Sequence, residues 1–271
     1  METTSQVEKE SKEIKRARHA WYYYDFGNSA YAAIILLAVF SIYFKNDVVG
    51  GAEGTRLWGI AVGIAAIIVA VVSPILGAIA DVSRSKKLFL GIFTAISIAF
   101  TGLLFFVGPG DVLMAMIFFI LAEIGYRGAQ VFYDALLVDV STPETVGNIS
   151  GKGWAIGMLG GIATLIIVLV PMQLIGDAFK PNYAFLITAL VFLVSAIPTF
   201  LYVKEKHEVT EQLPFGKLIK DAFKKLADTF KEIRHYKDFL RYMFAFLIYN
   251  DGIMMLMDFA AIIGGTLFGL G

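Results

Sequence analysis

The sequence is dominated by apolar runs of about twenty residues, each long enough to cross a hydrocarbon layer of about 30 Å as a helix. Hydrophobic residues make up 58% of the 271-residue chain and charged residues only 17%. Membrane-spanning β-strands would instead alternate with a period of two residues. The sequence therefore predicts an all-α polytopic membrane protein. The predicted spans lie at about 21–44, 57–80, 88–107, 112–140, 154–175 and 183–203, with a seventh from about 239.

The polar segments between the runs predict how the chain is divided. Residues 1–20 are expected to be a cytosolic N-terminal tail and residues 21–203 a six-helix bundle. Residues 204–238 are expected to be a cytosolic linker, followed at 239–271 by a further transmembrane helix. With the N-terminus inside, 19 Lys and Arg residues fall on the inner side and three on the outer side, which by the positive-inside rule predicts a cytosolic N-terminus.

The linker carries apolar residues at helical spacing with lysines between them. This pattern is typical of a basic amphipathic helix that lies on the inner leaflet. A helix that binds a protein partner is the alternative interpretation.

Composition excludes several classes of function. The chain has no cysteine, which excludes disulfides, thiolate metal sites and cysteine nucleophiles. Its three histidines, His19, His207 and His235, lie in polar stretches, so no histidine ligand is expected inside the membrane. The formal net charge is zero, so no nucleic-acid partner is expected. We expect no enzymatic activity, no metal site and no cofactor; the expected partners are the lipid bilayer and a small-molecule substrate.

Ionisable residues inside the apolar runs carry the strongest functional signal. Each costs about 2.5–3.5 kcal/mol on insertion scales, so it usually faces a cavity or a partner. At 100° per residue, Glu123, Arg127, Gln130 and Asp134 share a stripe of about 60° on one helix. A structural ion pair between Glu123 and Arg127 explains two of these residues. The other interpretation is a binding or proton-relay face, which also accounts for Asp134.

Two further helices carry acidic residues in related contexts. An aromatic residue closely precedes Asp25 in YYYD, Asp134 in VFYD and Asp251 in IYND. These helices are three apart each time, and transporters are often built from three-helix repeats with the substrate site between them. Snorkelling of Asp25 to the interface is the alternative. The predicted cavity residues are Asp25, Asn28, Glu123, Arg127, Gln130, Asp134, Asn250 and Asp251.

Glycines recur at four-residue spacing on the predicted fifth helix, at Gly153, Gly157 and Gly161. Small residues at this spacing allow two membrane helices to approach closely. We therefore expect this helix to pack tightly on a neighbour.

The segment after the second run, GAIADVSRSKK, resembles the signature loop of the major facilitator superfamily. Gly77 and Asp81 match that pattern, as do the basic residues at its end. Val82 stands where the superfamily usually has Arg, and Arg84 where it usually has Gly. The resemblance implies a gating loop, to which Asp139 at the cytoplasmic end of the fourth span is added. The predicted gating residues are Gly77, Asp81, Arg84, Lys86, Lys87 and Asp139.

Within that superfamily the chain resembles the autophagy-related vacuolar effluxer family and its prokaryotic relatives. Val138 departs from relatives, which commonly carry Pro there. The resemblance implies secondary transport by alternating access, with the first, fourth and seventh helices around the cavity. It is carried by YYYDFGNSAY at 22–31, VFYDALLVDV at 131–140, SGKGWAIGMLGG at 150–161 and FLIYNDGI at 246–253.

The resemblance also implies a substrate. The vacuolar members are associated with efflux of amino acids, so amino acids or similar small solutes are the expected cargo. Arg127 would then pair with a substrate carboxylate, and Asp134 or Glu123 with its amine. One acid could instead carry a coupling proton. The expected location is the plasma membrane of a prokaryote, or the vacuolar membrane of a eukaryote.

The superfamily has twelve helices in two halves, whereas this chain shows seven runs. The chain is therefore expected to be the N-terminal part of a longer transporter, or to assemble with a partner chain. Two alternatives to transport stay open. One is a membrane scaffold or regulatory subunit, and the other is an inactive truncated fragment.

Overall fold

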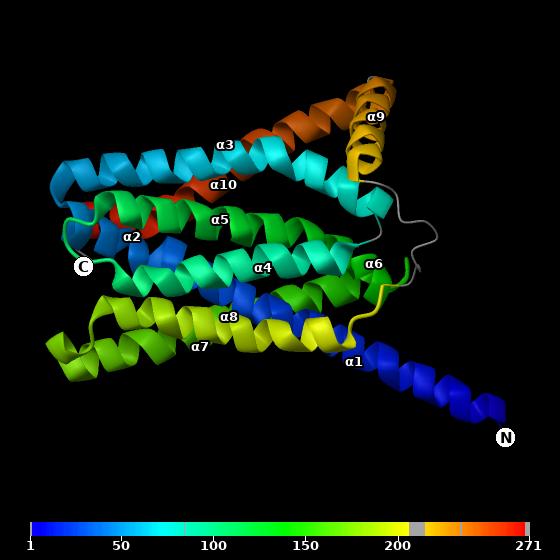
Figure 1. Ribbon diagram of the computed structural model, residues 1–271, viewed down its shortest axis with the longest axis horizontal. Helices are drawn as coiled ribbons and strands as arrows, with labels where there is room; N and C mark the ends of the chain where they lie inside the picture. The colour runs from blue at the N-terminus through cyan, green and yellow to red at the C-terminus, as the bar shows by residue number, and fades with distance from the viewer. Residues whose placement is uncertain (1, 84, 206–214, 234, 269–271) are drawn as a thin grey trace.

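The computed structural model describes residues 2–83, 85–205, 215–233 and 235–268. Throughout these residues the regular elements are helices, and the described chain contains no strand. The long helices lie side by side in a bundle (Figure 1). The predicted all-α fold is confirmed.

The chain begins with a helix that changes its winding. α1 runs over Glu2–Tyr31 and is followed by a π-helix, η1, over Ala32–Ala38. The short helix α2 (Phe40–Tyr43) and a second π-helix, η2 (Phe44–Val49), complete this first span. The residues predicted as a polar tail thus belong to the same helix as the first apolar run, since backbone hydrogen bonding does not depend on an apolar surrounding.

Five further spans follow, and together with the first they form the six helices of the described residues that are long and apolar enough to cross a membrane. Their number and positions confirm the first six predicted spans. The elements are α3 (Gly51–Ser83), α4 (Lys86–Leu103) with η3 (Leu104–Phe106), α5 (Val112–Ala135), α6 (Leu137–Val140), α7 (Val146–Ile175) with η4 (Gly176–Ala178), and α8 (Pro181–Tyr202).

Two helices lie beyond the six-helix bundle. α9 (Phe215–Ile233) falls in the predicted linker and contacts α3. Figure 1 shows it crosswise to the long helices, at the end of the bundle where α1 begins. α10 (Lys237–Phe268) is continuous and packs against η1 and α2. The seventh predicted membrane crossing falls on α10 and stays a prediction.

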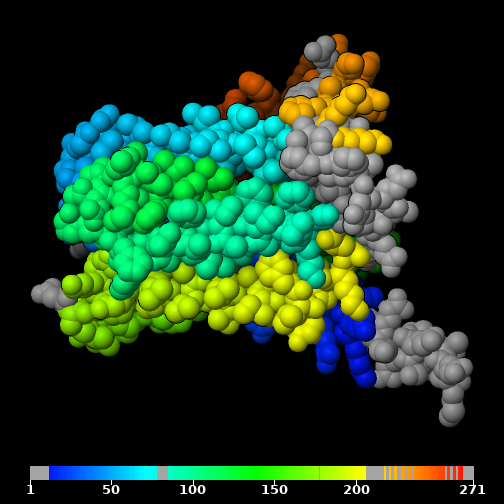
Figure 2. Space-filling model, in the orientation of Figure 1, coloured from blue at the N-terminus to red at the C-terminus, as the bar shows by residue number. Residues whose placement is uncertain are grey.

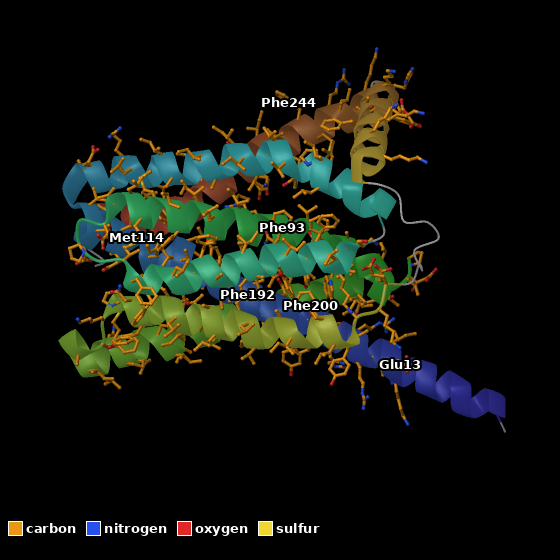
Figure 3. The ribbon with its side chains drawn as sticks, viewed as in Figure 1. Glu13, Phe93, Met114, Phe192, Phe200 and Phe244 are labelled. Atoms are coloured by element: carbon orange, nitrogen blue, oxygen red, sulfur yellow. The ribbon has the colours of Figure 1, made fainter. Side chains whose placement is uncertain are left out.

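Aromatic side chains fill the centre of the bundle. Trp58 of α3, Phe40 of α2 and Phe119 of α5 are fully buried and pack on one another, with ring centroids 4.6 to 5.9 Å apart. Phe192 of α8 lies edge-to-face on Tyr24 of α1 at 5.6 Å (Figure 3). Because burial of aromatic rings supplies a large share of packing energy, this core fixes α1 among its neighbours.

The outer face of the bundle is apolar. α3, α5, α4 and α8 form a continuous surface in Figure 2. Large apolar side chains of these helices are strongly exposed, including Ile67 and Val71 of α3 and Val194 and Leu201 of α8. In a soluble protein such a surface would be unfavourable, but it suits contact with lipid chains. The chain is a multi-pass integral membrane protein.

Candidate functional site

A cavity of about 530 Å³ lies between the first span, α5 and α7, and Ile253 of α10 also lines it. We call it the main cavity. Its polar lining includes Asp25, Asn28, Arg127 and Gln130, four of the predicted cavity residues. Its apolar lining is largely aliphatic and comes from η1, α7 and α10, through Ala32, Ala33, Leu36, Leu37, Met158, Ile162, Leu165 and Ile253.

The contribution of η1 to the main cavity depends on its π-helical winding. A π-helix has one more residue per hydrogen-bonded turn than an α-helix, and such turns are frequent at functional sites. Because its turns are wider, the face that η1 presents to the cavity differs from that of an α-helix with the same sequence. Sequence periodicity did not indicate this change.

A buried polar cluster stands beside the main cavity. Arg127 Nε donates a hydrogen bond to Glu123 Oε1, and the two side chains form an ion pair. Tyr31 Oη donates to the other carboxylate oxygen, Glu123 Oε2, at 3.0 Å. The Glu123 side chain is 2% exposed and that of Arg127 22%. Glu123 therefore holds and neutralises Arg127, while the guanidinium reaches the cavity wall.

Two tyrosines complete this cluster. Tyr126 stacks on Tyr31 with ring centroids 4.5 Å apart, and its hydroxyl accepts a hydrogen bond from Gln130 Nε2 at 3.2 Å. Neither tyrosine was among the predicted site residues. Tyr31 follows Asn28 by three residues and Tyr126 follows Glu123 by three, so helical spacing was the signal that could have found them.

A smaller cavity of about 150 Å³ shares four lining residues with the main cavity, Asp25, Asn28, Gln130 and Trp154. We call it the acidic cavity because Asp25 of α1 and Asp134 of α5 both line it. The structure thus brings these two predicted acids together from helices that are distant in the sequence. The remaining lining residues are Trp21, Tyr133 and Ser150; like Trp154, they were not among the predicted site residues.

Two buried oxygen atoms in residues that line the acidic cavity have no hydrogen-bond partner. They are Asn28 Oδ1 and Tyr133 Oη, in residues that are 3% and 5% exposed. The ring of Tyr133 is fixed, because Trp21 stacks on it at 4.4 Å and donates its indole N–H to the Tyr133 carbonyl at 3.1 Å. Buried polar atoms are usually paired, so unpaired ones beside a cavity indicate where a water molecule or a ligand can bind.

The glycines of α7 bring this helix against α1, which confirms the predicted close packing. A Cβ on Gly157 would lie 2.6 Å from Asp25 Oδ2 and 2.7 Å from Ser29 Oγ. A Cβ on Gly160 would come still closer to the Phe26 carbonyl oxygen and would lie 2.6 Å from Phe26 Cα, whereas one on Gly161 would make ordinary contacts. The tightest approach is therefore at Gly160, one residue before the end of the predicted pattern.

The predicted residues on α10 lie apart from these cavities. Asn250 is half-buried and Asp251 is exposed. Neither lines the main or the acidic cavity, which α10 reaches through Ile253. Their assignment to the substrate path stays a prediction.

Hydrogen bonds from two lysines join helices at the end of the bundle where α1 begins. Lys86 Nζ lies 3.2 Å from Asp139 Oδ2 and also donates to the Ala135 carbonyl at 3.0 Å. Lys87 Nζ donates to the Val203 carbonyl at 2.7 Å. This brings together three predicted gating residues, Lys86, Lys87 and Asp139, at one end of the bundle.

The structure describes the other predicted gating residues only in part. Gly77 is half-buried on α3, and a Cβ there would lie 3.9 Å from Val131 Cγ1. Arg84 and the side chain of Asp81 lie outside the described residues.

Loss of the Lys86 ion pair is expected to open this end of the bundle. Lys86→Met would remove the Lys86 ammonium group from the Asp139 carboxylate, which is 3% exposed. The protein has no native cysteine, so a cysteine placed at the fully buried Leu136 gives a specific probe. Maleimide labelling of that cysteine should be about tenfold faster in Lys86→Met. A tenfold change corresponds to an opening free energy lower by about 1.4 kcal/mol. Lys152→Met, an exposed lysine on α7, is the control, and equal rates in both would exclude a closing role for Lys86.

The fold and these cavities define a class of protein. Membrane proteins with charged side chains around a cavity between apolar helices are typically transporters or channels. The family model described as "Vacuole effluxer Atg22 like" matches residues 57–145 and 138–271. The chain belongs to this family of the major facilitator superfamily.

The chain is also similar to individual bacterial proteins. The chain is 30% identical over 267 residues to "Uncharacterized MFS-type transporter YxiO" of Bacillus subtilis (strain 168), covering 94% of this chain and 62% of that protein. An "Uncharacterized protein" of Aquifex aeolicus (strain VF5) is 24% identical, over 78% of this chain and 50% of its own length. "Multidrug resistance protein MdtG" of Dickeya zeae (strain Ech586) is 27% identical, over 70% and 44%.

The matches span between 44% and 62% of the length of these relatives. No solved structure matches the chain significantly.

Proposed function

We propose that the chain acts in a secondary active transporter that moves small solutes by alternating access, with the main cavity on the solute path. The observation that carries this proposal is the cavity of about 530 Å³ within helices otherwise suited to lipid, lined by Asp25 and Arg127. Charged side chains in such a place are costly unless they face water or a solute. The end of the bundle where Lys86 pairs with Asp139 would be one of its two gates.

The proposal extends to orientation and cargo. Small solutes that carry an amine, the amino acids expected from the sequence among them, are the proposed cargo, and outward movement is supported by the family's description as an effluxer. A cytosolic N-terminus is supported by the distribution of Lys and Arg, and a plasma-membrane location by the bacterial relatives. In this arrangement α10 is a seventh span and α9 lies on the inner leaflet, where its exposed lysines Lys217, Lys220 and Lys224 would meet anionic headgroups.

A counterflow assay in proteoliposomes tests the transport activity. Vesicles preloaded with unlabelled solute are given labelled leucine, lysine or phenethylamine, and accumulation of any one supports the proposal. Asp134→Asn is expected to lower the initial rate at least about tenfold, because one charge-assisted contact of about 1.5–3 kcal/mol is lost.

The control for this assay is Asp228→Asn, which removes an exposed acid on α9 and changes the net charge equally. Thermal unfolding of each variant is measured alongside the transport rate. If Asp134→Asn and Arg127→Gln alter only stability, or if folded protein moves none of the solutes, a non-transporting scaffold or regulatory subunit becomes the better interpretation.

A further inference from the structure

We propose that the site selects organic cations, namely an ammonium group carried on an apolar body, over zwitterions and anions. This inference rests on the proposed function, since it names the class of solute that the same cavities would take. Three observations support it: the net charge of the residues that line the cavities, the unpaired oxygen atoms of the acidic cavity, and the mainly apolar lining of the adjoining main cavity.

The charge balance favours a positive ligand. Three charged residues line the two cavities, Asp25, Arg127 and Asp134. Arg127 is neutralised by Glu123, which is buried beside it and also held by Tyr31. Within the described part of the chain, neither Asp25 nor Asp134 has a cationic partner within 4 Å. Two carboxylates thus remain uncompensated, and they face the same small space.

The other groups in the acidic cavity suit an ammonium ion. Asn28 Oδ1 and Tyr133 Oη are buried oxygen atoms without a hydrogen-bond partner, and each can accept from an N–H donor. Asn28 follows Asp25 by three residues on α1 and lines the same cavity, so the acid and the free acceptor lie on one face of the helix. Trp21, Tyr133 and Trp154 supply aromatic walls, which attract cations through their π faces.

The size of the acidic cavity limits what enters it. Its volume is about 150 Å³, less than a third of that of the main cavity. The adjoining main cavity, about 530 Å³, is lined mainly by aliphatic side chains such as Leu36, Met158 and Ile162. A solute that spans both would place its ammonium group between Asp25 and Asp134 and its apolar body against η1 and α7.

A carboxylate on the solute would be disfavoured in the same place. Its natural partner, the Arg127 guanidinium, already gives one N–H to Glu123. An added carboxylate would also approach two uncompensated acids. The arrangement therefore opposes the zwitterion expected from the sequence, in which Arg127 would pair with a substrate carboxylate.

Three matched ligands test the selectivity. Phenethylamine is a cation at pH 7, phenylalanine is its zwitterionic carboxylated analogue, and 3-phenylpropionate is the anion on a similar body. Binding to the purified chain in lipid nanodiscs is followed by tryptophan fluorescence, since Trp21 and Trp154 line the acidic cavity. Phenethylamine is expected to bind at least tenfold more tightly than phenylalanine, and 3-phenylpropionate more weakly still.

Variants assign the binding to the acidic cavity. Asp25→Asn and Asp134→Asn keep the shape of the side chain and should each weaken phenethylamine binding at least tenfold. Asp228→Asn on α9 should leave it unchanged. Circular dichroism shows whether each variant is folded. The order of affinities for the three ligands is measured on the unmodified protein, so it does not depend on the folding of any variant.

Each other outcome overturns the inference. Tighter binding of phenylalanine, lost in Arg127→Gln, would assign the site to zwitterions and leave the transport proposal intact. Phenethylamine binding that survives both Asp variants would place the cation elsewhere. Failure of folded protein to bind any of the three ligands would also reject cation selectivity, whereas the transport proposal fails only if counterflow is absent.

Discussion

Gly160→Ala is expected to destabilise the protein by about 1–3 kcal/mol, the usual cost of overpacking a well-packed core. A Cβ at this position would lie 2.6 Å from Phe26 Cα and 2.7 Å from its carbonyl carbon. These are backbone atoms of α1, so no side-chain rotation can relieve the contact. α1 and α7 would have to separate, which also disturbs Asp25 and the cavity wall. Thermal unfolding in detergent micelles measures the loss.

Gly151→Ala is the matched control on the same helix. A Cβ at Gly151 meets no atom within 4 Å, and alanine is favoured over glycine in a helix by about 1 kcal/mol. This variant should be as stable as the unmodified protein or more so. If the two variants had equal stability, the close approach of α7 to α1 would be wrong.

The positions of the membrane spans were predictable because a physical length determines them. A hydrocarbon layer of about 30 Å requires about twenty apolar residues, and this constraint located all six spans. The ends were less predictable. α7 begins at Val146 and not near residue 154, since helical hydrogen bonding continues through polar residues beyond the apolar run.

The winding of the first span was not predictable from its residues. Ala32–Ala38 has the sequence AAIILLA, an aliphatic run that suits α- and π-helices alike. The choice between them depends on packing against neighbouring helices, which sequence periodicity does not describe. This matters for the site, because η1 supplies much of the apolar wall of the main cavity.

The sequence predicted most of the charged residues of the site, but not which of them pair with one another. Helical spacing grouped Glu123, Arg127 and Asp134 on one face. In the structure the first two form an ion pair, while Asp134 lines the acidic cavity together with Asp25. The contact of Lys86 with Asp139 joins residues 53 positions apart, beyond the reach of any helical periodicity. Long-range pairings decide which charges are neutralised, and therefore what the cavity can bind.

Arg127→Leu is expected to be strongly destabilising, by about 3–5 kcal/mol, the typical cost of breaking a buried ion pair by removing one partner. It would leave the Glu123 carboxylate, 2% exposed, with Tyr31 as the remaining hydrogen-bond donor that the structure identifies. The double variant Glu123→Gln/Arg127→Leu should recover most of this stability, because glutamine carries no charge and can still accept the Tyr31 hydroxyl. A double-mutant cycle of unfolding free energies measures the coupling.

The same variants test whether Arg127 takes part in binding. The double variant removes one negative and one positive charge, so the two uncompensated acids of the acidic cavity stay in place. Phenethylamine should therefore bind to it within about threefold of the unmodified protein, a difference of less than 1 kcal/mol. If Arg127→Leu were instead as stable as the unmodified protein, Glu123 would not be a charged partner in the fold. The positive charge of Arg127 would then partly compensate the negative charges of Asp25 and Asp134. The cavities would carry less net negative charge, and the argument for cation selectivity would fail.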